Sequence, residues 1–478
     1  MSRRLLNKNI HSRKNFALLI LALLPFISIP LIGSQFYFRH DDSALLLWAK
    51  EFAKPFYQAL SADPAVNGFA NYPGMAPYWR PFDYLYIKAL WYLFGTSPAP
   101  YYIVGGLTFL AAVYFLFRLV QEQISVPAAV LSCFLLFIAF NGTMYNLFHI
   151  GVPVSFFYQM GMIYCFWAYL QQPRWIYLTG MLLFLLPAMG RQTTSVILAA
   201  MLIVAIFDRR KELKIFLRKS LPATAILFVS IYILKFSPQT SKGSVIALLP
   251  DLDKVLIFLS ERFFYYGTIL TSGITGSFML LFFSAGVLHH LAEAIKKRFA
   301  PGRIEWLWLP AALFMTFALM RIYPYGIYWL AFCVLYLFVF DDELRMSLGW
   351  AGASLLCFLA AKYYHNGYLL EAGFPLAIAL GILAVRLAKP FTIVWRQYVE
   401  AHKTKLALTA AGAVLLAIPF VFAFTDKVPV LSERVEIIKM AIDSNKNFAS
   451  LMNYLQHELP QNAVVYELSE EAVGTTQT

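Results

Sequence analysis

Apolar runs long enough to cross a lipid bilayer recur along this chain from Phe16 to about residue 425. A membrane-spanning helix needs about 20 mostly apolar residues, and only helices and closed barrels satisfy every backbone polar group in hydrocarbon. Of the 478 residues, 60% are hydrophobic and only 14% are charged, which is more apolar surface than a chain in water could bury. These runs predict an all-α polytopic membrane protein with about 13 transmembrane helices.

The distribution of positive charge predicts how the chain crosses the membrane. Arg3, Arg4, Lys8, Arg13 and Lys14 precede the first apolar run, which ends near Gly33 and has no small-residue cleavage site. Three later basic connections, residues 208–214, 296–303 and 386–405, alternate with connections that are poor in Lys and Arg. Basic loops remain in the cytoplasm, so the N-terminus is expected inside and, after an odd number of spans, the C-terminus outside. The net charge of +13 therefore needs no nucleic-acid partner.

We expect residues 1–425 to form one multi-span membrane domain and residues 426–478 a small segment on the outer face. The first outer loop, 34–100, is expected to carry two interfacial helices, 43–62 and 81–94. A second outer loop is expected over 237–263. After the first span, further spans are expected near 101–117, 127–142, 152–170, 175–189, 192–207, 219–236, 264–288, 304–320, 325–340, 346–361, 367–385 and 404–425.

Two adjacent carboxylates, Asp41 and Asp42, follow the first span directly. Acidic side chains are costly near hydrocarbon, so such a pair is a candidate functional site. One of them would act as a general base, while the other caps the helix from Ser43 or orients a neighbour. The structural alternative is that Asp42 only caps that helix. The pattern requires no cofactor, although a divalent cation at Asp41 and Asp42 is compatible with it.

Several cationic and aromatic side chains are expected at the outer ends of spans, on the same side as the acidic pair. An arginine there can donate two parallel hydrogen bonds to a phosphate group, which predicts a lipid-phosphate substrate. The alternatives are arginines that only anchor helices at the interface and histidines that pack as polar groups. The candidate phosphate- or substrate-binding residues are Arg80, His149, Arg191, Arg321, Tyr323, Lys362 and His365, and Asn146 and Glu371 lie at the same boundary.

The remaining acidic groups are interpreted as structural. Asp251 and Asp253 form an Asp-x-Asp pair in an outer loop, where a nucleotide-sugar site is not expected. The acidic residues 341–343, next to Arg345, are expected to form a solvated turn on the cytoplasmic side. Asp83 is expected in the first turn of its helix, where a negative charge favours the helix dipole.

The four cysteines, Cys133, Cys165, Cys333 and Cys357, all lie within apolar runs. Their spacing fits neither a metal site nor a disulfide framework. We expect them to pack as small apolar residues in the core.

The first 210 residues resemble the GT-C glycosyltransferases in layout. The features that carry the resemblance are a first span that starts inside, an acidic pair just beyond it, two interfacial helices, and the step Tyr78-Trp79-Arg80-Pro81 before a short helix ending Leu93-Phe94-Gly95. These polytopic enzymes use polyprenyl-phosphate sugars and include protein O-mannosyltransferases and the aminoarabinose transferase of lipid A. The chain departs from the family where the outer loop after the 127–142 span lacks a further Asp and where Arg191-Gln192 stands in place of Lys-Glu.

The resemblance implies transfer of a sugar from a polyprenyl-phosphate carrier to an acceptor hydroxyl of a glycan, lipid or protein. Asp41 or Asp42 would be the base, inversion is favoured over retention, and the site would face the periplasm of a bacterial inner membrane. A lipid or sugar transporter or flippase is the main alternative, although such proteins usually carry ionisable groups near the bilayer midplane. A polysaccharide polymerase or ligase is another, which would favour a large, Arg-rich late loop.

The expected topology has a direct test. Cysteines introduced at Asn71 and Gln461 are expected to react with a membrane-impermeant thiol reagent on intact cells, because both positions are predicted outside. A cysteine introduced at Lys211 is expected to react only after permeabilisation. Labelling of Lys211→Cys from outside, with protection of Asn71→Cys, would reverse the orientation and separate the predicted site from the periplasm.

Overall fold

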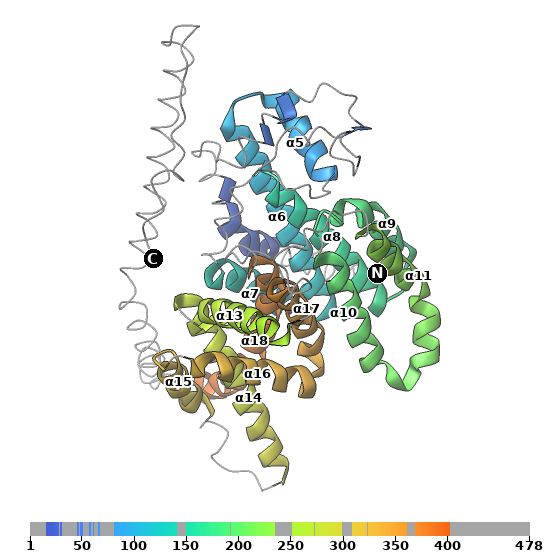
Figure 1. Ribbon diagram of the computed structural model, residues 1–478. Helices are drawn as coiled ribbons and strands as arrows, with labels where there is room; N and C mark the ends of the chain where they lie inside the picture. Colours follow the sequence, from blue (N-terminus) through green and yellow to red (C-terminus); the bar gives the residue numbers. More distant parts are fainter. Residues whose placement is uncertain are drawn as a thin grey trace, which may run out of the picture.

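The computed structural model is helical throughout the part of the chain that it describes (Figure 1). It describes residues 16–27, 29–30, 45–46, 48–50, 57–58, 61, 66, 81–140, 150–191, 193–234, 251–271, 273–298, 308–322, 324–360 and 369–401. No strand occurs in these ranges. Spans expected at 404–425 and the segment 426–478 lie outside them.

The helices begin and end close to the residues that the apolar runs predict. In chain order they are η1 (Leu24–Ile27), α5 (Pro81–Phe94), α6 (Pro98–Gln123), α7 (Val126–Ala139), α8 (Val152–Gln171), α9 (Trp175–Ala188), α10 (Thr193–Asp208), η5 (Arg210–Glu212), α11 (Leu213–Leu234), α13 (Leu252–Thr271), α14 (Gly273–Arg298), α15 (Trp308–Leu319), α16 (Tyr325–Phe340), α17 (Asp342–Leu359) and α18 (Leu369–Ala401). Helices α6, α7 and α8 each have a proline in the first turn. The missing N–H of proline costs no hydrogen bond there, because amides of the first turn have no acceptor within the helix.

Within the described ranges, four helices are long and apolar enough to cross a membrane, namely Pro98–Gln123, Arg210–Ile233, Thr275–Ala294 and Leu369–Lys389. Six more apolar helices are shorter, among them α7, α9, α10 and α16. This composition indicates an integral membrane protein. The number of 13 spans stays a prediction.

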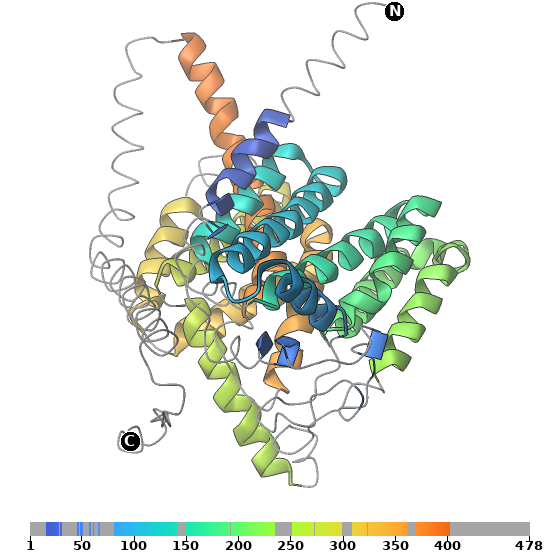
Figure 2. The same cartoon turned by 90° about the horizontal axis from the view of Figure 1, so that it is seen from above.

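Helix α18 forms the centre of the bundle. In its most apolar stretch 83% of residues are buried, whereas in α11 only 33% are. Figure 1 shows α18 among other helices and Figure 2 shows its C-terminal end projecting beyond them, and it packs directly against α7, α14 and α17. The contact with α7 needs a glycine, because a Cβ at Gly381 would lie 2.8 Å from the Ala128 carbonyl oxygen. By contrast, α11 exposes large apolar side chains such as Leu221 and Phe228, as a helix facing lipid would.

Buried ion pairs mark the two ends of the bundle. At one end Arg191 pairs with Glu371, at the start of α18. At the other end Arg386, 15 residues further along α18, pairs with Asp341. Fifteen residues of helix rise about 22 Å. We call the first of these the Arg191 end. We call the second the Arg345 end, because Arg345 of α17 pairs there with Asp208 at the end of α10.

The single span expected at 264–288 is wrong, because the helix is interrupted within that range. Helix α13 ends at Thr271 and α14 begins at Gly273, whose φ of 62° is a backbone conformation that favours glycine. Helix α13 buries one stripe, Val255, Arg262, Tyr266 and Leu270, and leaves most of its other side chains partly or fully exposed. The start of α13 also replaces part of the loop expected at 237–263.

Contacts of α13 place its second half at the Arg191 end. The ring of Tyr266 packs 6.0 Å from that of Phe358, near the end of α17. At its start, the Lys254 ammonium lies 2.8 Å from Asp251, and the Lys254 amide donates a 3.2 Å hydrogen bond to the same carboxylate. The hydrogen bond from the Lys254 side chain lowers the pKa of Asp251. Asp251 therefore caps α13, which agrees with the structural interpretation of the Asp-x-Asp pair.

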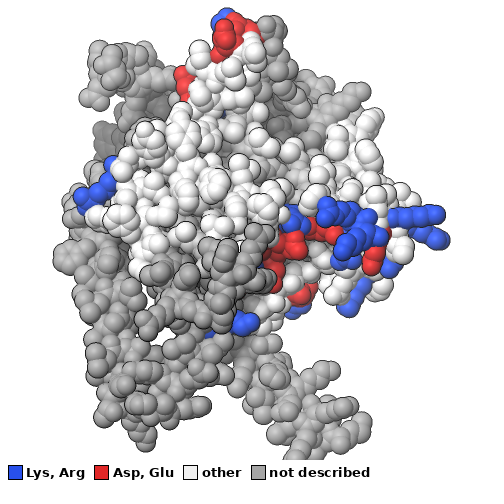
Figure 3. Space-filling view, turned by 90° about the horizontal axis from the view of Figure 1, so that it is seen from below, with Lys and Arg blue, Asp and Glu red and all other residues white. Residues whose placement is uncertain are grey.

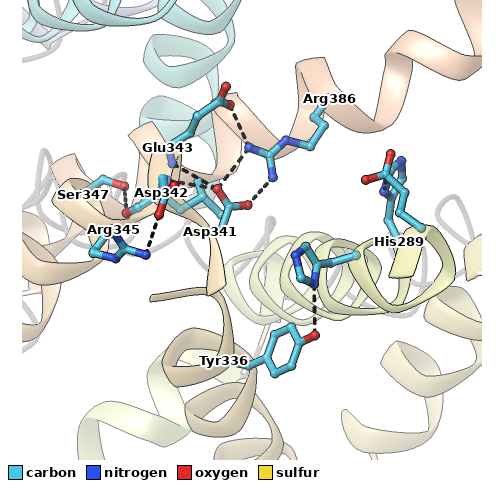
Figure 4. Close-up of polar contacts among 11 residues, drawn as sticks. His289, Tyr336, Asp341, Asp342, Glu343, Arg345, Ser347 and Arg386 are labelled. Atoms are coloured by element: carbon cyan, nitrogen blue, oxygen red, sulfur yellow. Dashed lines mark hydrogen bonds and ion pairs between the residues drawn. The ribbon is translucent and has the colours of Figure 1, made fainter. Parts of the chain in front are cut away.

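The solvated turn expected at 341–343 holds for Asp342 and Glu343, which are exposed, but is wrong for Asp341. Asp341 is buried and caps α17 by accepting hydrogen bonds from the amides of Glu343 and Leu344. Arg386 pairs with both Asp341 and Glu343 (Figure 4). Arg345, also buried, pairs with Asp208 and Asp342 and donates to the carbonyls of Phe338 and Val339 at 3.0 and 2.9 Å. The ion pair with Arg386 of α18 and the cap of α17 remove Asp341 from solvent, while Asp342 and Glu343 remain exposed.

The cysteines are where the apolar runs predict. All four are free, with Cys133, Cys165 and Cys333 buried and Cys357 partly exposed. At Gly180 a side chain would collide with the Cys165 sulfur, so α8 and α9 approach closely there. Their packing is that of small apolar side chains.

Loss of the Arg345 charge tests whether these pairs hold the helices together. Arg345→Met leaves Asp208 without its partner, and removing one member of a buried pair costs about 3–5 kcal/mol. We expect a clearly lower Tm in detergent, partly restored in Arg345→Met/Asp208→Leu because the double variant leaves no unpaired charge there. Lys214→Gln, an exposed cation at the same end, is the control and is expected to unfold like the wild type.

Equal Tm values for Arg345→Met and Lys214→Gln would show that the network adds nothing to stability.

Candidate functional site

A tight turn between α9 and α10 positions Arg191. The amides of Gly190 and Arg191 donate to the carbonyls of Pro187 and Ala188 at 3.2 and 3.1 Å. The Thr194 hydroxyl donates a 3.0 Å hydrogen bond to the same Ala188 carbonyl, which ties the start of α10 to the end of α9. Arg191 is therefore held by backbone hydrogen bonds on both sides of the turn.

The Arg191 side chain reaches the start of α18. Its Nη1 pairs with Glu371, whose side chain is 4% exposed against 15% for Arg191. The Thr193 hydroxyl donates a 2.6 Å hydrogen bond to the other oxygen of Glu371, and Gln159 of α8 donates to Thr193 at 3.0 Å. Both carboxylate oxygens of Glu371 are thus engaged, and α8, α10 and α18 meet at one polar cluster.

Aromatic rings form the floor of this cluster. The guanidinium carbon of Arg191 lies 3.8 Å from the ring centre of Phe156, within range of a cation–π interaction. Phe156 packs against Phe109 and Phe374 with ring centres 6.0 and 5.7 Å away, and all three rings are buried. This floor closes the cluster on the side of the bundle interior and fixes the plane of the guanidinium.

Asp83 adds a second buried carboxylate. It lies in the first turn of α5, is 3% exposed and accepts a hydrogen bond from the Ser155 hydroxyl of α8. A Cβ built on Gly190 would lie 3.4 Å from its Oδ2, so Asp83 faces the turn that carries Arg191. Asp83 therefore lies in the first turn of its helix as expected, and it also contacts α8 and faces the turn that carries Arg191.

The cluster has a chemical asymmetry that matters for binding. Glu371 occupies one arm of the Arg191 guanidinium, while the Nε–H is buried without a hydrogen-bond partner among the described residues. A buried donor without an acceptor costs about 1–3 kcal/mol, which an anionic oxygen arriving at that edge would recover. We define the Arg191 cluster as Asp83, Ser155, Gln159, Arg191, Thr193 and Glu371.

Two of the predicted site residues can be placed. Arg191 lies in the cluster just described. Arg321 follows α15, is exposed and stacks on Phe317 of its own helix with 4.6 Å between guanidinium carbon and ring centre. The other predicted site residues lie outside the described ranges: Asp41, Asp42, Arg80, His149, Tyr323, Lys362 and His365.

Asp83, Ser155 and Gln159 were not predicted as site residues. Gln159 and Ser155 are four residues apart on α8, a spacing that puts both on one face of a helix that is otherwise almost wholly apolar. Polar side chains on one face of such a helix are a sequence pattern that could have indicated the cluster. Asp83 lies next to the Arg80-Pro81 step, so the same motif pointed close to it.

The described part of the chain holds no group of three His, Cys, Asp or Glu side chains that could bind a metal ion. The divalent cation considered for Asp41 and Asp42 falls outside that part. Within the Arg191 cluster the two carboxylates accept hydrogen bonds from hydroxyl and guanidinium groups. This arrangement is suited to holding an arginine side chain rather than a metal ion.

No protein-family model matches this chain, and no curated protein sequence is similar to it. The fold and the cluster define an all-helical integral membrane protein with paired charges at both ends of its bundle. The GT-C resemblance therefore depends on the motifs of the first 210 residues alone.

The Arg191 cluster predicts a specific coupling between two helices. Glu371→Gln keeps the shape of the side chain but leaves the Arg191 charge unpaired, so we expect a loss of stability of about 3 kcal/mol. Arg191→Met/Glu371→Leu is expected to recover most of it, as measured by thermal unfolding in detergent. Glu293→Gln, an exposed carboxylate of α14, is the matched control.

Additive losses in the double variant would mean that the two side chains do not interact.

Proposed function

We propose that this protein transfers a sugar from a polyprenyl-phosphate carrier to an acceptor hydroxyl at the Arg191 end of the membrane domain. The observation that carries the proposal is the Arg191 guanidinium, fixed by Glu371 and Phe156 and left with a buried Nε–H that finds no acceptor in the described part of the chain. The family resemblance of the first 210 residues supplies the reaction type.

Arg191 would bind the phosphate of the donor. Its Nη1 is held by Glu371, and the buried Nε–H is the donor that a phosphate oxygen can accept from. A charge-assisted hydrogen bond of this kind is worth about 1.5–3 kcal/mol. The same bond stabilises the negative charge that accumulates on the phosphate as the sugar leaves, so it favours the transition state over the bound donor.

Asp41 or Asp42 would be the general base. The acceptor hydroxyl oxygen attacks the anomeric carbon and gives its proton to the carboxylate. The bond between that carbon and the phosphate oxygen breaks, and polyprenyl phosphate leaves with the electron pair. Phosphate is a stable leaving anion, so the reaction needs no carboxylic acid opposite the base, unlike glycoside hydrolysis. A base in place contributes about 10²–10⁴-fold to such a step.

The charge distribution supports an orientation with the Arg191 end outside. The Arg345 end carries the basic connections at Arg209–Lys211 and at Arg386, which the positive-inside rule assigns to the cytoplasm. A periplasmic site in a bacterial inner membrane then follows for the Arg191 end. Nucleotide sugars are absent from that side, which favours a lipid-linked donor.

The transporter interpretation receives less support from the positions of the charges. A transporter would place ionisable groups near the middle of the bilayer, at interrupted helices. In the described spans, the buried charged side chains lie at the two ends instead, with Glu371 and Arg386 about 22 Å apart along α18.

An assay with purified protein tests the proposal. Wild type is expected to transfer sugar from the polyprenyl phosphate and not from the matching nucleotide sugar. Arg191→Ala is expected to lower kcat/KM by about ten- to hundredfold, from the loss of one charge-assisted bond. Arg191→Lys is expected to recover only part, because an ammonium cannot reproduce the fork of the guanidinium.

Arg174→Ala, an exposed arginine at the Arg345 end, is the matched control and is expected to keep full activity. One of Asp41→Asn and Asp42→Asn is expected to abolish transfer while donor binding remains. Activity with the nucleotide sugar alone, or full activity in Arg191→Ala, would exclude the proposed role of the cluster.

A further inference from the structure

A second polar site lies at the opposite end of the molecule, where α8, η5 and α11 meet. A groove there has a cavity volume of about 70 Å³, opens to solvent, and has one carboxylate, Glu212, in its wall. Its walls combine apolar side chains, Leu170 and Phe216, with polar ones, Gln171, Arg209, Lys219 and Ser220. The proposed glycosyl transfer uses none of these residues.

Hydrogen bonds between helices shape this groove. Arg209 donates to the Gln171 side chain at 2.9 Å, which uses one of its five N–H groups. The Tyr169 hydroxyl donates a 3.3 Å hydrogen bond to the Lys219 carbonyl, which fixes the start of α11 against the end of α8. The groove is therefore built by tertiary contacts rather than being a gap beside a single helix.

Positive charge is concentrated around the groove. Residues 208–220 contain six cations and two carboxylates, Asp208 and Glu212, which leaves a net charge of +4. Asp208 is engaged by the buried Arg345, so its charge is largely neutralised there. Of the six cations in residues 208–220, Arg209 is partly buried and the others are exposed. Figure 3 shows Lys and Arg side chains gathered at one edge of the molecule, beside Asp and Glu.

The apolar side chains beside the groove indicate which class of molecule binds there. Directly beyond the basic residues, α11 exposes Leu221, Phe228 and Ile231, and its most apolar stretch is only one-third buried. This face is suited to acyl chains, and the cations at its start lie where headgroup phosphates lie. A soluble anion or an acidic protein would match the cations but not the apolar face that continues from them.

We propose that this groove binds the headgroup of an anionic glycerophospholipid from the leaflet at the Arg345 end. Arg209 and Lys219 hold the phosphate, Ser220 and Gln171 line the polar wall, and the acyl chains run along the exposed face of α11. Such a lipid would connect α11, which packs less than the other helices, to the end of α8.

Native mass spectrometry of the detergent-solubilised full chain tests this proposal. Phosphatidylglycerol is added to the wild type, and phosphatidylcholine serves as the neutral-headgroup comparison. We expect preferential binding of phosphatidylglycerol, weakened about tenfold or more in Arg209→Gln/Lys219→Gln, because two cations near the phosphate are lost. Inorganic phosphate at equal concentration is expected not to compete, since it lacks the acyl chains.

Lys211→Gln/Lys214→Gln is the matched control, since it removes the same charge from positions that do not line the groove. An equal loss in the control would overturn the proposal, because binding would then follow net charge alone. Equal binding of the two lipids, or full competition by inorganic phosphate, would also overturn it. If the double variant does not fold, Lys219→Gln alone, at an exposed position, is expected to give a smaller loss in the same direction, and unchanged binding would contradict the proposal.

Discussion

A charged side chain among apolar helices must find a partner of opposite charge, and the architecture of this protein follows from that constraint. Water cannot reach Glu371, Arg345 or Asp341 freely, so each is paired across helices. The pairs join α10 to α17 and α18 at one end and to α18 at the other. They fix which faces of these helices meet, a choice that apolar packing alone leaves loosely determined, because lipid tails are as apolar as the side chains.

The same constraint produces the candidate site. Arg191 is held on one arm by Glu371 and on its face by Phe156, so its remaining donors point in a direction set by the protein. An arginine fixed in this way loses little conformational freedom when an anion binds, which favours affinity and catalysis alike. The contacts that stabilise the Arg191–Glu371 pair therefore also hold the site in a conformation ready to bind an anion. Hydrogen bonds of Thr193 and Gln159 connect this pair to α8.

Helices were predictable from this sequence because their causes are local. The run 325–340 is apolar throughout and bounded by Pro324 and Asp341, and the structure places α16 there. The break at Gly273 was missed although small and polar residues interrupt the apolar run over 271–277, because the flanking residues are apolar enough to be interpreted as one span. Which helices face each other could not be predicted, since Arg191 and Glu371 are 180 positions apart and Ser155 and Asp83 are 72 apart. Burial of Asp341 and Arg345 likewise depends on their distant partners, Arg386 and Asp208.

The central claim is that a lipid-linked phosphate binds at the Arg191 end. Cryo-electron microscopy of the purified protein with added polyprenyl phosphate tests it most directly. The account predicts density for the phosphate within about 3 Å of the Arg191 Nε, with the prenyl chain leaving toward the lipid. Polyprenyl phosphate bound only at the Arg345 end, or bound elsewhere while Arg191 contacts only Glu371 and Phe156, would contradict it.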